Sequence, residues 1–296
     1  MTDKYAVIGK PIAHSKSPEI HTMFAAQFKD KPEGDISYEK IEAPLDGFAA
    51  TVERLRKEGY KGCNVTVPFK QEAASITNVA NLSASAGLVH SANTLHWNEY
   101  GEMVANNTDG FGLVRDIRNN LGFNMHRKKI LLVGAGGAAR GVLYPLMDQA
   151  ELSMPQETPA LIVIVNRTPS RAFQIINESD FSLIAARVDS TKPEVTKLEA
   201  CDYKDLMGTQ FDLVINATSS GLSDEMPPLP SGIFAPGALA YDMMYGRETP
   251  FMKFSRENGA QVADGLGMLV EQAAEAFFIW RGVRPDTASV IAALRG

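Results

Sequence analysis

The chain has 296 residues, of which 45% are hydrophobic and 22% charged, and its formal net charge is −6. This length exceeds one ordinary hydrophobic core and predicts two domains, while the composition is that of a soluble globular protein. The acidic balance argues against a nucleic-acid-binding surface, the two distant cysteines argue against a disulfide framework, and the histidine spacing predicts no metal site.

A strand-like run at residues 5–8 follows the N-terminus after a few residues, so we expect no signal segment. No stretch is long and apolar enough to span a bilayer. We therefore expect a cytoplasmic protein whose partner is a small molecule, with neither nucleic acid nor membrane as a ligand. Whether the chain is a monomer or a homodimer stays open at this point.

Strand-like and helix-like segments then alternate, which predicts parallel sheets joined by crossover helices. In the first third, strands are expected at residues 5–8, 38–41 and 62–68, and helices at residues 18–28 and 45–58.

The first helix follows His14-Ser15-Lys16-Ser17-Pro18, in which Ser17 is a natural N-cap and Pro18 suits the first helical position. Capping alone would explain this motif. Two hydroxyl groups beside a helix N-terminus would also suit a substrate carboxylate, because the helix end carries partial positive charge.

Polar residues accompany the strand at 62–68. In Asn64-Val-Thr-Val-Pro-Phe-Lys70, alternation places the two valines on one face and Asn64 and Thr66 on the other, and Lys70 lies just past the strand end. Asp109 precedes a helix expected at residues 111–120. Lys70 and Asp109 are candidates for an acid/base pair, because burial and a neighbouring carboxylate tune the proton affinity of a lysine. The alternatives are a solvated lysine and an aspartate that serves only as an N-cap.

The run from Ile130 to Arg140, ILLVGAGGAAR, is a short apolar strand that enters a glycine-rich turn. Gly134 permits a tight turn, Gly136 lets a pyrophosphate approach bare backbone, and Ala139 allows the next helix to pack closely on the strand. That helix would direct its first N–H groups at the phosphates. We interpret the turn as a dinucleotide site, although glycines also end strands for purely steric reasons.

The next strand, at residues 160–165, indicates which dinucleotide is bound. An NAD site usually offers a carboxylate there for the ribose 2′-hydroxyl. This chain has Asn166-Arg167-Thr168 and then Arg171, and guanidinium groups bind a 2′-phosphate through charge-assisted hydrogen bonds. NADP is therefore favoured over NAD, the alternative being that these arginines are solvated surface charges. A loop expected at residues 151–159 accounts for the long spacing from the glycines.

Later strands are expected at residues 211–218 and 239–244, and a last helix at 268–280. Because the nucleotide-binding sheet already has its strands, this helix should cross back to the first domain. We predict an α/β protein of two α/β domains. Residues 109–264 form a Rossmann-like NADP-binding domain, and residues 1–108 plus 265–296 form a discontinuous N-terminal substrate-binding and catalytic domain closed by the C-terminal helices.

Hydride chemistry on a secondary alcohol needs a nicotinamide, a group that exchanges the hydroxyl proton, and polar contacts that fix the ring. Lys70 and Asp109 could exchange the proton. Thr66, Asn93 and Gln272 could fix the ring. Each of these residues taken alone is more often a structural hydrogen bonder, but as a set they favour a dehydrogenase.

Over nearly its whole length the chain resembles the shikimate dehydrogenase family. The resemblance rests on motifs that follow one another in the family's order: HSKSP at 14–18, NVTVPFK at 64–70, ANT at 92–94, NTDG at 107–110, GAGGAAR at 134–140, NRT at 166–168, DMMY at 242–245 and DGLGMLVEQ at 264–272. The chain departs from the family pattern mainly around residues 151–159 and 189–196, which concerns loop length and not chemistry.

The resemblance implies NADPH-dependent reduction of 3-dehydroshikimate to shikimate, a step towards chorismate and the aromatic amino acids. Lys70 and Asp109 would be the catalytic pair, with Lys70 the favoured proton-transfer group. The substrate would be bound at Ser15, Ser17, Thr66, Lys70, Asn93, Asp109, Tyr245 and Gln272. The two serines among them would hold its carboxylate. NADP would be bound at Gly134, Ala135, Gly136, Gly137, Ala138, Ala139, Asn166, Arg167, Thr168, Arg171, Thr218, Met243, Gly265 and Met268, the last two beside the nicotinamide.

Two other functions stay open. One is a quinate/shikimate dehydrogenase that uses NAD, which the arginines after residue 165 oppose. The other is a non-catalytic NADP-binding regulator, which the presence of both Lys70 and Asp109 opposes.

Overall fold

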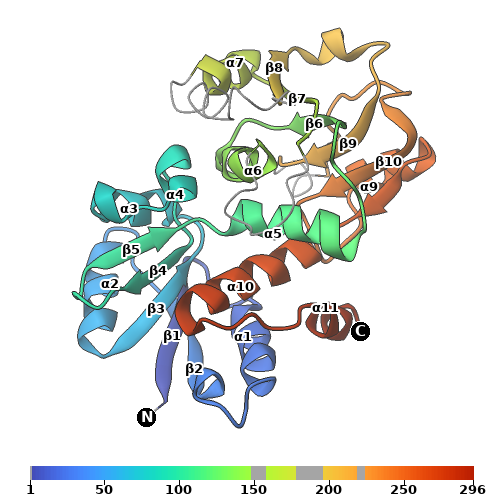
Figure 1. The fold of residues 1–296 in the computed structure, drawn as a ribbon. Helices are drawn as coiled ribbons and strands as arrows, with labels where there is room; N and C mark the ends of the chain where they lie inside the picture. The colour runs from blue at the N-terminus through green and yellow to red at the C-terminus, as the bar shows by residue number, and fades with distance from the viewer. Residues whose placement is uncertain (1, 148–157, 178–195, 219–223) are drawn as a thin grey trace. The chain divides into compact units, whose positions relative to one another are not determined.

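The structure is a computed structural model that describes residues 2–147, 158–177, 196–218 and 224–296 (Figure 1). Contacts divide the chain into two compact units, which we call unit 1 (Met1–Gly112 with Leu269–Gly296) and unit 2 (Leu113–Met268). The chain passes from one to the other within helices α5 (Asp109–Arg115) and α10 (Leu266–Arg281). The predicted α/β fold with a discontinuous N-terminal part is confirmed. The unusual segments at 151–159 and 189–196 lie almost wholly outside the described residues.

Unit 1 is built on a five-stranded sheet with the strand order β2-β1-β3-β4-β5. In chain order its elements are β1 (Asp3–Gly9), α1 (Ser17–Ala26), β2 (Ile36–Glu42), α2 (Phe48–Lys57), β3 (Tyr60–Val65), α3 (Lys70–Ser75), α4 (Ala84–Val89), β4 (Thr94–Trp97) and β5 (Met103–Asn106), followed at the C-terminus by α10 and α11 (Ala288–Arg295). β1 pairs in parallel with β2 and β3, whereas β4 runs antiparallel to both β3 and β5.

The expectation of purely parallel sheets is therefore wrong for unit 1. Strands β4 and β5 form a hairpin that was not predicted, and its turn closes through the Gly101 N–H, which donates to the Asn98 carbonyl at 2.9 Å. The strand predicted at 62–68 ends earlier, at Val65. Val65 is 2% exposed but Val67 is 69% exposed, so the predicted alternation does not extend to the second valine.

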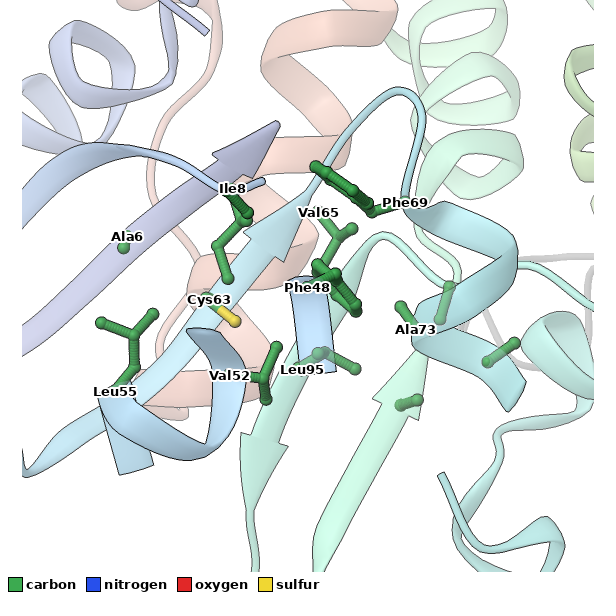
Figure 2. Packing of buried hydrophobic residues seen from close by; sticks show 14 of the residues in the cluster. Ala6, Ile8, Phe48, Val52, Leu55, Cys63, Val65, Phe69, Ala73 and Leu95 are labelled. Carbon is green, nitrogen blue, oxygen red and sulfur yellow. The ribbon is translucent and has the colours of Figure 1, made fainter. Parts of the chain in front are cut away.

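The side chains of β1 alternate between two packed faces. Ala6 and Ile8 join Val65 in a core covered by α2 and α3, as Figure 2 shows. On the opposite face Tyr5 stacks on Trp280 of α10, with the ring centroids 4.6 Å apart. The C-terminal helices complete unit 1 because a second cluster joins α1 to α10 and α11, comprising Ile20, Phe24, Val270, Ala273, Ala274, Phe277 and Val290.

Unit 2 is built on a six-stranded sheet with the order β11-β10-β9-β6-β7-β8, and its pairings are parallel. In chain order its elements are β6 (Lys129–Val133), α6 (Gly137–Met147), β7 (Leu161–Val165), α7 (Pro169–Asn177), β8 (Lys197–Cys201), β9 (Phe211–Asn216), β10 (Phe234–Asp242), α9 (Pro250–Glu257) and β11 (Gln261–Ala263). Numbered within the unit, the order is 3-2-1-4-5-6, the Rossmann dinucleotide-binding arrangement, which reverses between β6 and β9. Among the described residues, none of the helices is both long and apolar enough to cross a membrane.

Candidate functional site

Lys70 and Asp109 are the first residues of α3 and α5, and both belong to unit 1. The Lys70 Nζ atom lies 2.5 Å from Asp109 Oδ2, and the two side chains are 28% and 21% exposed. The other carboxylate oxygen, Oδ1, accepts from Asn93 Nδ2 at 2.9 Å. The structure therefore brings the two predicted side chains into contact, and Asp109 is the first residue of α5 and not its N-cap.

Asn93 is the polar centre around this pair and is 2% exposed. Besides Asp109, its Nδ2 atom lies 3.3 Å from Gln272 Oε1, which α10 brings in from the C-terminal end of the chain. The fold thus brings together four predicted residues, Lys70, Asn93, Asp109 and Gln272. Lys70 and Gln272 are about two thirds of the chain apart in sequence. Thr66 lies just beyond the end of β3, and its N–H donates to the Ile8 carbonyl at 2.9 Å.

Two further buried residues hold Asp109 and Asn93 in place, and sequence reasoning did not single them out. The Asn107 Oδ1 atom accepts from the Asp109 N–H at 3.1 Å. The Thr108 N–H donates to Asn93 Oδ1 at 2.9 Å. The signal was available, because asparagine side chains commonly bond the backbone two residues further on.

Ser15 and Ser17 lie at the N-terminus of α1, and the expected cap is not formed. Lys16 occupies the N-cap position, so Ser17 is already the first helical residue. The Ser15 hydroxyl instead lies 3.2 Å from the Ser17 hydroxyl and accepts from the Ser17 N–H at 3.3 Å. Both hydroxyls therefore stand at a helix end where partial positive charge favours an anion.

In unit 2 the predicted cofactor residues follow the carboxyl ends of parallel strands. These ends are in register, because Val133 pairs with both Val165 and Asn216, and Asn216 pairs with Asp242. The sheet consequently gathers the predicted residues along one edge: 134–139 after β6, 166–171 after β7, Thr218 after β9, Met243 after β10 and Gly265 after β11.

The glycine turn has the geometry that a pyrophosphate requires. Gly134 has φ +115°, and a Cβ there would lie 3.1 Å from the Ala217 carbonyl oxygen. Gly136 and Gly137 are exposed, and no atom lies within 4 Å of where a Cβ would be. Ala139 is fully buried. The N-terminus of α6 thus offers open backbone, and these residues fit a dinucleotide phosphate.

The polar residues after β7 also fit the 2′-phosphate of NADP. Arg167 and Arg171 are both exposed, and the Asn166 Nδ2 atom fixes the loop by donating to the Thr168 carbonyl at 2.9 Å. Arg167 has a carboxylate neighbour, Glu225, at 3.6 Å, but their side chains are 88% and 62% exposed. An ion pair so exposed contributes little and would compete weakly with a bound phosphate.

The loop that enters α10 is closely packed where the nicotinamide contacts were predicted. A Cβ on Gly265 would lie 2.2 Å from the Met243 carbonyl oxygen, and one on Gly267 would lie 1.9 Å from a carboxylate oxygen of Asp116. Only glycine fits at either position without a shift of the backbone or of a buried carboxylate.

Asp116 and Tyr241 support this loop, and sequence reasoning missed both. The Tyr241 hydroxyl donates to Asp116 Oδ2 at 2.6 Å and accepts from the Met268 N–H at 3.3 Å. Burial and the Asp116 carboxylate raise the pKa of Tyr241 well above its usual value, so the phenol stays protonated and keeps donating. Tyr245, predicted to contact the substrate, belongs to unit 2, and burial raises its pKa as well.

Comparisons with known proteins identify the family of this chain. The model of the shikimate dehydrogenase substrate binding domain matches residues 7–95, and that of the shikimate 5′-dehydrogenase C-terminal domain matches residues 265–295. A relative from Methylobacillus flagellatus, named shikimate dehydrogenase (NADP(+)), is 54% identical over 295 residues, 99% of each chain. Another of that name, from Aromatoleum aromaticum, is 51% identical over 99% of this chain and 97% of its own.

Solved structures extend the likeness to the fold. An Ael1 enzyme from Pseudomonas putida is 45% identical, with a TM-score of 0.86 over 99% of this chain and 98% of its own. The shikimate 5-dehydrogenase of Thermus thermophilus, solved in complex with NADP(H) and shikimate, is 29% identical, with a TM-score of 0.78 over 99% of both chains. At these identities over the full length, the chain belongs to the shikimate dehydrogenase family.

Proposed function

We propose that this enzyme catalyses the reversible, NADPH-dependent reduction of 3-dehydroshikimate to shikimate, a step in the synthesis of chorismate and the aromatic amino acids. The observation that carries the proposal is the Lys70–Asp109 pair, 2.5 Å apart and held beside Asn93 and Gln272. Its chemistry matches the activity named for the relatives, NADP(+)-dependent oxidation of shikimate.

The two units divide the work between substrate and cofactor. Unit 1 binds the substrate and supplies the acid/base pair, Lys70 and Asp109, while unit 2 binds NADP. Three features of unit 2 support this division: the open backbone at Gly136 and Gly137, the exposed Arg167 and Arg171, and the Rossmann strand order.

When bound, NADPH supplies the hydride that reduces the substrate carbonyl carbon. The Lys70 Nζ group donates a proton to the carbonyl oxygen as that oxygen becomes a hydroxyl, and takes the proton back in the oxidation of shikimate. Asp109 Oδ2 holds the ammonium in place. Since a positive charge beside a developing oxyanion stabilises it, the same lysine also lowers the barrier electrostatically.

The remaining polar residues bind and orient the ring. The Ser15 and Ser17 hydroxyls hold the carboxylate at the N-terminus of α1. Asn93, Gln272 and Thr66 bond the ring hydroxyls that are not oxidised. A ring held at both ends presents one carbonyl to Lys70, which reduces the entropy lost on reaching the transition state.

The proposal is tested by following the reduced-nicotinamide absorbance band with purified protein and four substrate pairs: shikimate or quinate, each with NADP+ or NAD. We expect shikimate with NADP+ to give the highest kcat/KM. Equal rates with NAD would contradict the cofactor assignment, and preference for quinate would identify a quinate/shikimate dehydrogenase. Binding of NADP+ without turnover of either substrate would indicate a non-catalytic regulator.

A further inference from the structure

Tyr38, on β2, touches both halves of the proposed substrate site. Its hydroxyl donates to Asn64 Oδ1 at 2.7 Å, and the Ser17 side chain lies beside it. The ring is fixed by His21 of α1, which is fully buried and stacks on it at 4.2 Å with 7° between the planes.

Asn64 continues this connection towards the Lys70–Asp109 pair. Its Nδ2 atom donates to Thr94 Oγ1 at 3.1 Å and lies 3.2 Å from the Asn93 carbonyl oxygen. The Thr94 hydroxyl donates to Asn93 Oδ1 at 3.0 Å, and Asn93 Nδ2 donates to Asp109 Oδ1 at 2.9 Å. Asn64, Thr94 and Asn93 are 6%, 0% and 2% exposed, so water offers no easy substitute for a lost partner.

The donors of this chain all point in one direction, from Tyr38 through Asn64, Thr94 and Asn93 to the Asp109 carboxylate. Hydrogen bonds aligned in series polarise one another, and an ionised acceptor at the end strengthens the last of them. The position of Asn93 against Asp109 is therefore coupled to the position of Tyr38, whose ring stacks on α1, the helix that carries Ser17.

We propose that Tyr38 is a positioning residue for catalysis, which couples the carboxylate-binding serines to the Asn93–Asp109 contact through Asn64. It holds the two ends of the substrate site at a fixed separation, so that a substrate seated on the serines meets Lys70 correctly. This inference rests on the proposed function, because both ends are defined by their contacts with shikimate.

The test compares Tyr38→Phe with the wild type, using shikimate and NADP+. The phenylalanine keeps the stacking on His21 but leaves the buried Asn64 oxygen without its donor, so we expect the KM for shikimate to rise about 5- to 20-fold. The KM for NADP+ should stay within about twofold, since a general loss of structure would change both constants. A shikimate KM within about twofold of the wild type would overturn the inference.

Tyr60→Phe is the matched control. Tyr60 is a buried tyrosine of the same unit, on β3, and its hydroxyl bonds Glu39 outside this chain of hydrogen bonds. We expect its kinetic constants to stay within about twofold of the wild type. A rise in the shikimate KM as large as that of Tyr38→Phe would show that any lost tyrosine hydroxyl has this effect, which would also overturn the inference.

Asn64→Ala cuts the next bond and serves as a second variant should Tyr38→Phe not fold. Because both substitutions break one chain, the double variant should be no more than about twofold worse than the worse single variant. Effects that multiply would contradict the coupling. The wild-type assay separates the two proposals: no shikimate-dependent reduction of NADP+ by the wild type would contradict the proposed function, whereas an active wild type with an unaffected Tyr38→Phe variant contradicts only this inference.

Discussion

Lys70→Ala is the substitution that examines the catalytic pair most closely. It removes the ammonium that lies 2.5 Å from Asp109 Oδ2, in a site where the two side chains are 28% and 21% exposed. A positioned acid/base group contributes about 10²- to 10⁴-fold to rate. At 1.36 kcal/mol per tenfold, this corresponds to about 3 to 5 kcal/mol of lost transition-state stabilisation.

We expect kcat to fall by that factor while the dissociation constant for shikimate changes by no more than about threefold, because Asn93, Gln272 and the two serines remain. Steady-state kinetics gives the first quantity, and equilibrium binding of shikimate in the presence of NADP+ gives the second. Lys57→Ala is the control, since Lys57 is 72% exposed on α2 and pairs only with a surface glutamate in this region. Near-normal turnover by Lys70→Ala would remove Lys70 from the mechanism.

Asp109→Asn then shows which member of the pair carries the proton. If Lys70 does so, the amide still contacts the lysine, and kcat should fall less than it does in Lys70→Ala. A larger loss in Asp109→Asn, together with substantial activity in Lys70→Ala, would assign the proton to Asp109. The two variants must therefore be compared under identical conditions.

Three further outcomes are expected in the remainder of the molecule. Replacing Arg167 and Arg171 by alanine should raise the KM for NADP+ about 10- to 100-fold but leave the KM for NAD within about threefold, because only NADP carries the 2′-phosphate. An equal rise of both KM values in steady-state kinetics would contradict this expectation. Gly267→Ala should lower the free energy of unfolding, measured in urea, by about 2 kcal/mol or more, because the new Cβ would lie 1.9 Å from a buried carboxylate oxygen. Gly87→Ala in α4 is the control and should be neutral or slightly stabilising, since the nearest atom to its new Cβ would be 3.9 Å away. Equal effects of the two substitutions would refute the packing argument. Burial lowers the pKa of His21 to about 3, so between about pH 6.5 and pH 3 the unfolded chain binds a proton on this residue and the folded chain does not. The free energy of unfolding is therefore highest above about pH 6.5 and decreases as the pH falls below it. Between about pH 7.5 and pH 5 the wild type should lose about 2 kcal/mol more unfolding free energy than His21→Phe, and parallel pH profiles of the two proteins would be evidence against a neutral buried imidazole.

The sequence was informative where chemistry depends on residues adjacent in the chain. The glycine turn, the arginines after β7 and the polar ends of the strands were all predicted, because parallel strands bring their carboxyl ends to one edge whatever their separation in sequence. Lys70 and Asp109 were candidates for a pair because the lysine follows a strand, the aspartate precedes a helix, and a neighbouring carboxylate tunes the proton affinity of a lysine. Period-two alternation and the Asn98–Gly101 turn were also present in the sequence, so the missed hairpin of β4 and β5 was predictable in principle.

The remaining features depend on contacts between distant residues. Tyr241 and Asp116 are 125 positions apart, and nothing in either local sequence indicates that a tyrosine will support the Met268 backbone. Ser17 is not the N-cap, because α1 begins one residue earlier than expected and Lys16 occupies the cap position. Tyr38 gave no signal, because an aromatic residue on a strand is ordinary and only the fold brings it to Asn64.

A crystal structure of the ternary complex with shikimate and NADP+ would test the proposed binding of the substrate. We expect the substrate hydroxyl to be oxidised to lie within hydrogen-bond distance of Lys70 Nζ, and the carboxylate at the other end of the ring to be bound by the Ser15 and Ser17 hydroxyls. A shikimate molecule bound with its carboxylate away from the serines, or with that hydroxyl out of reach of both Lys70 and Asp109, would contradict the proposed binding.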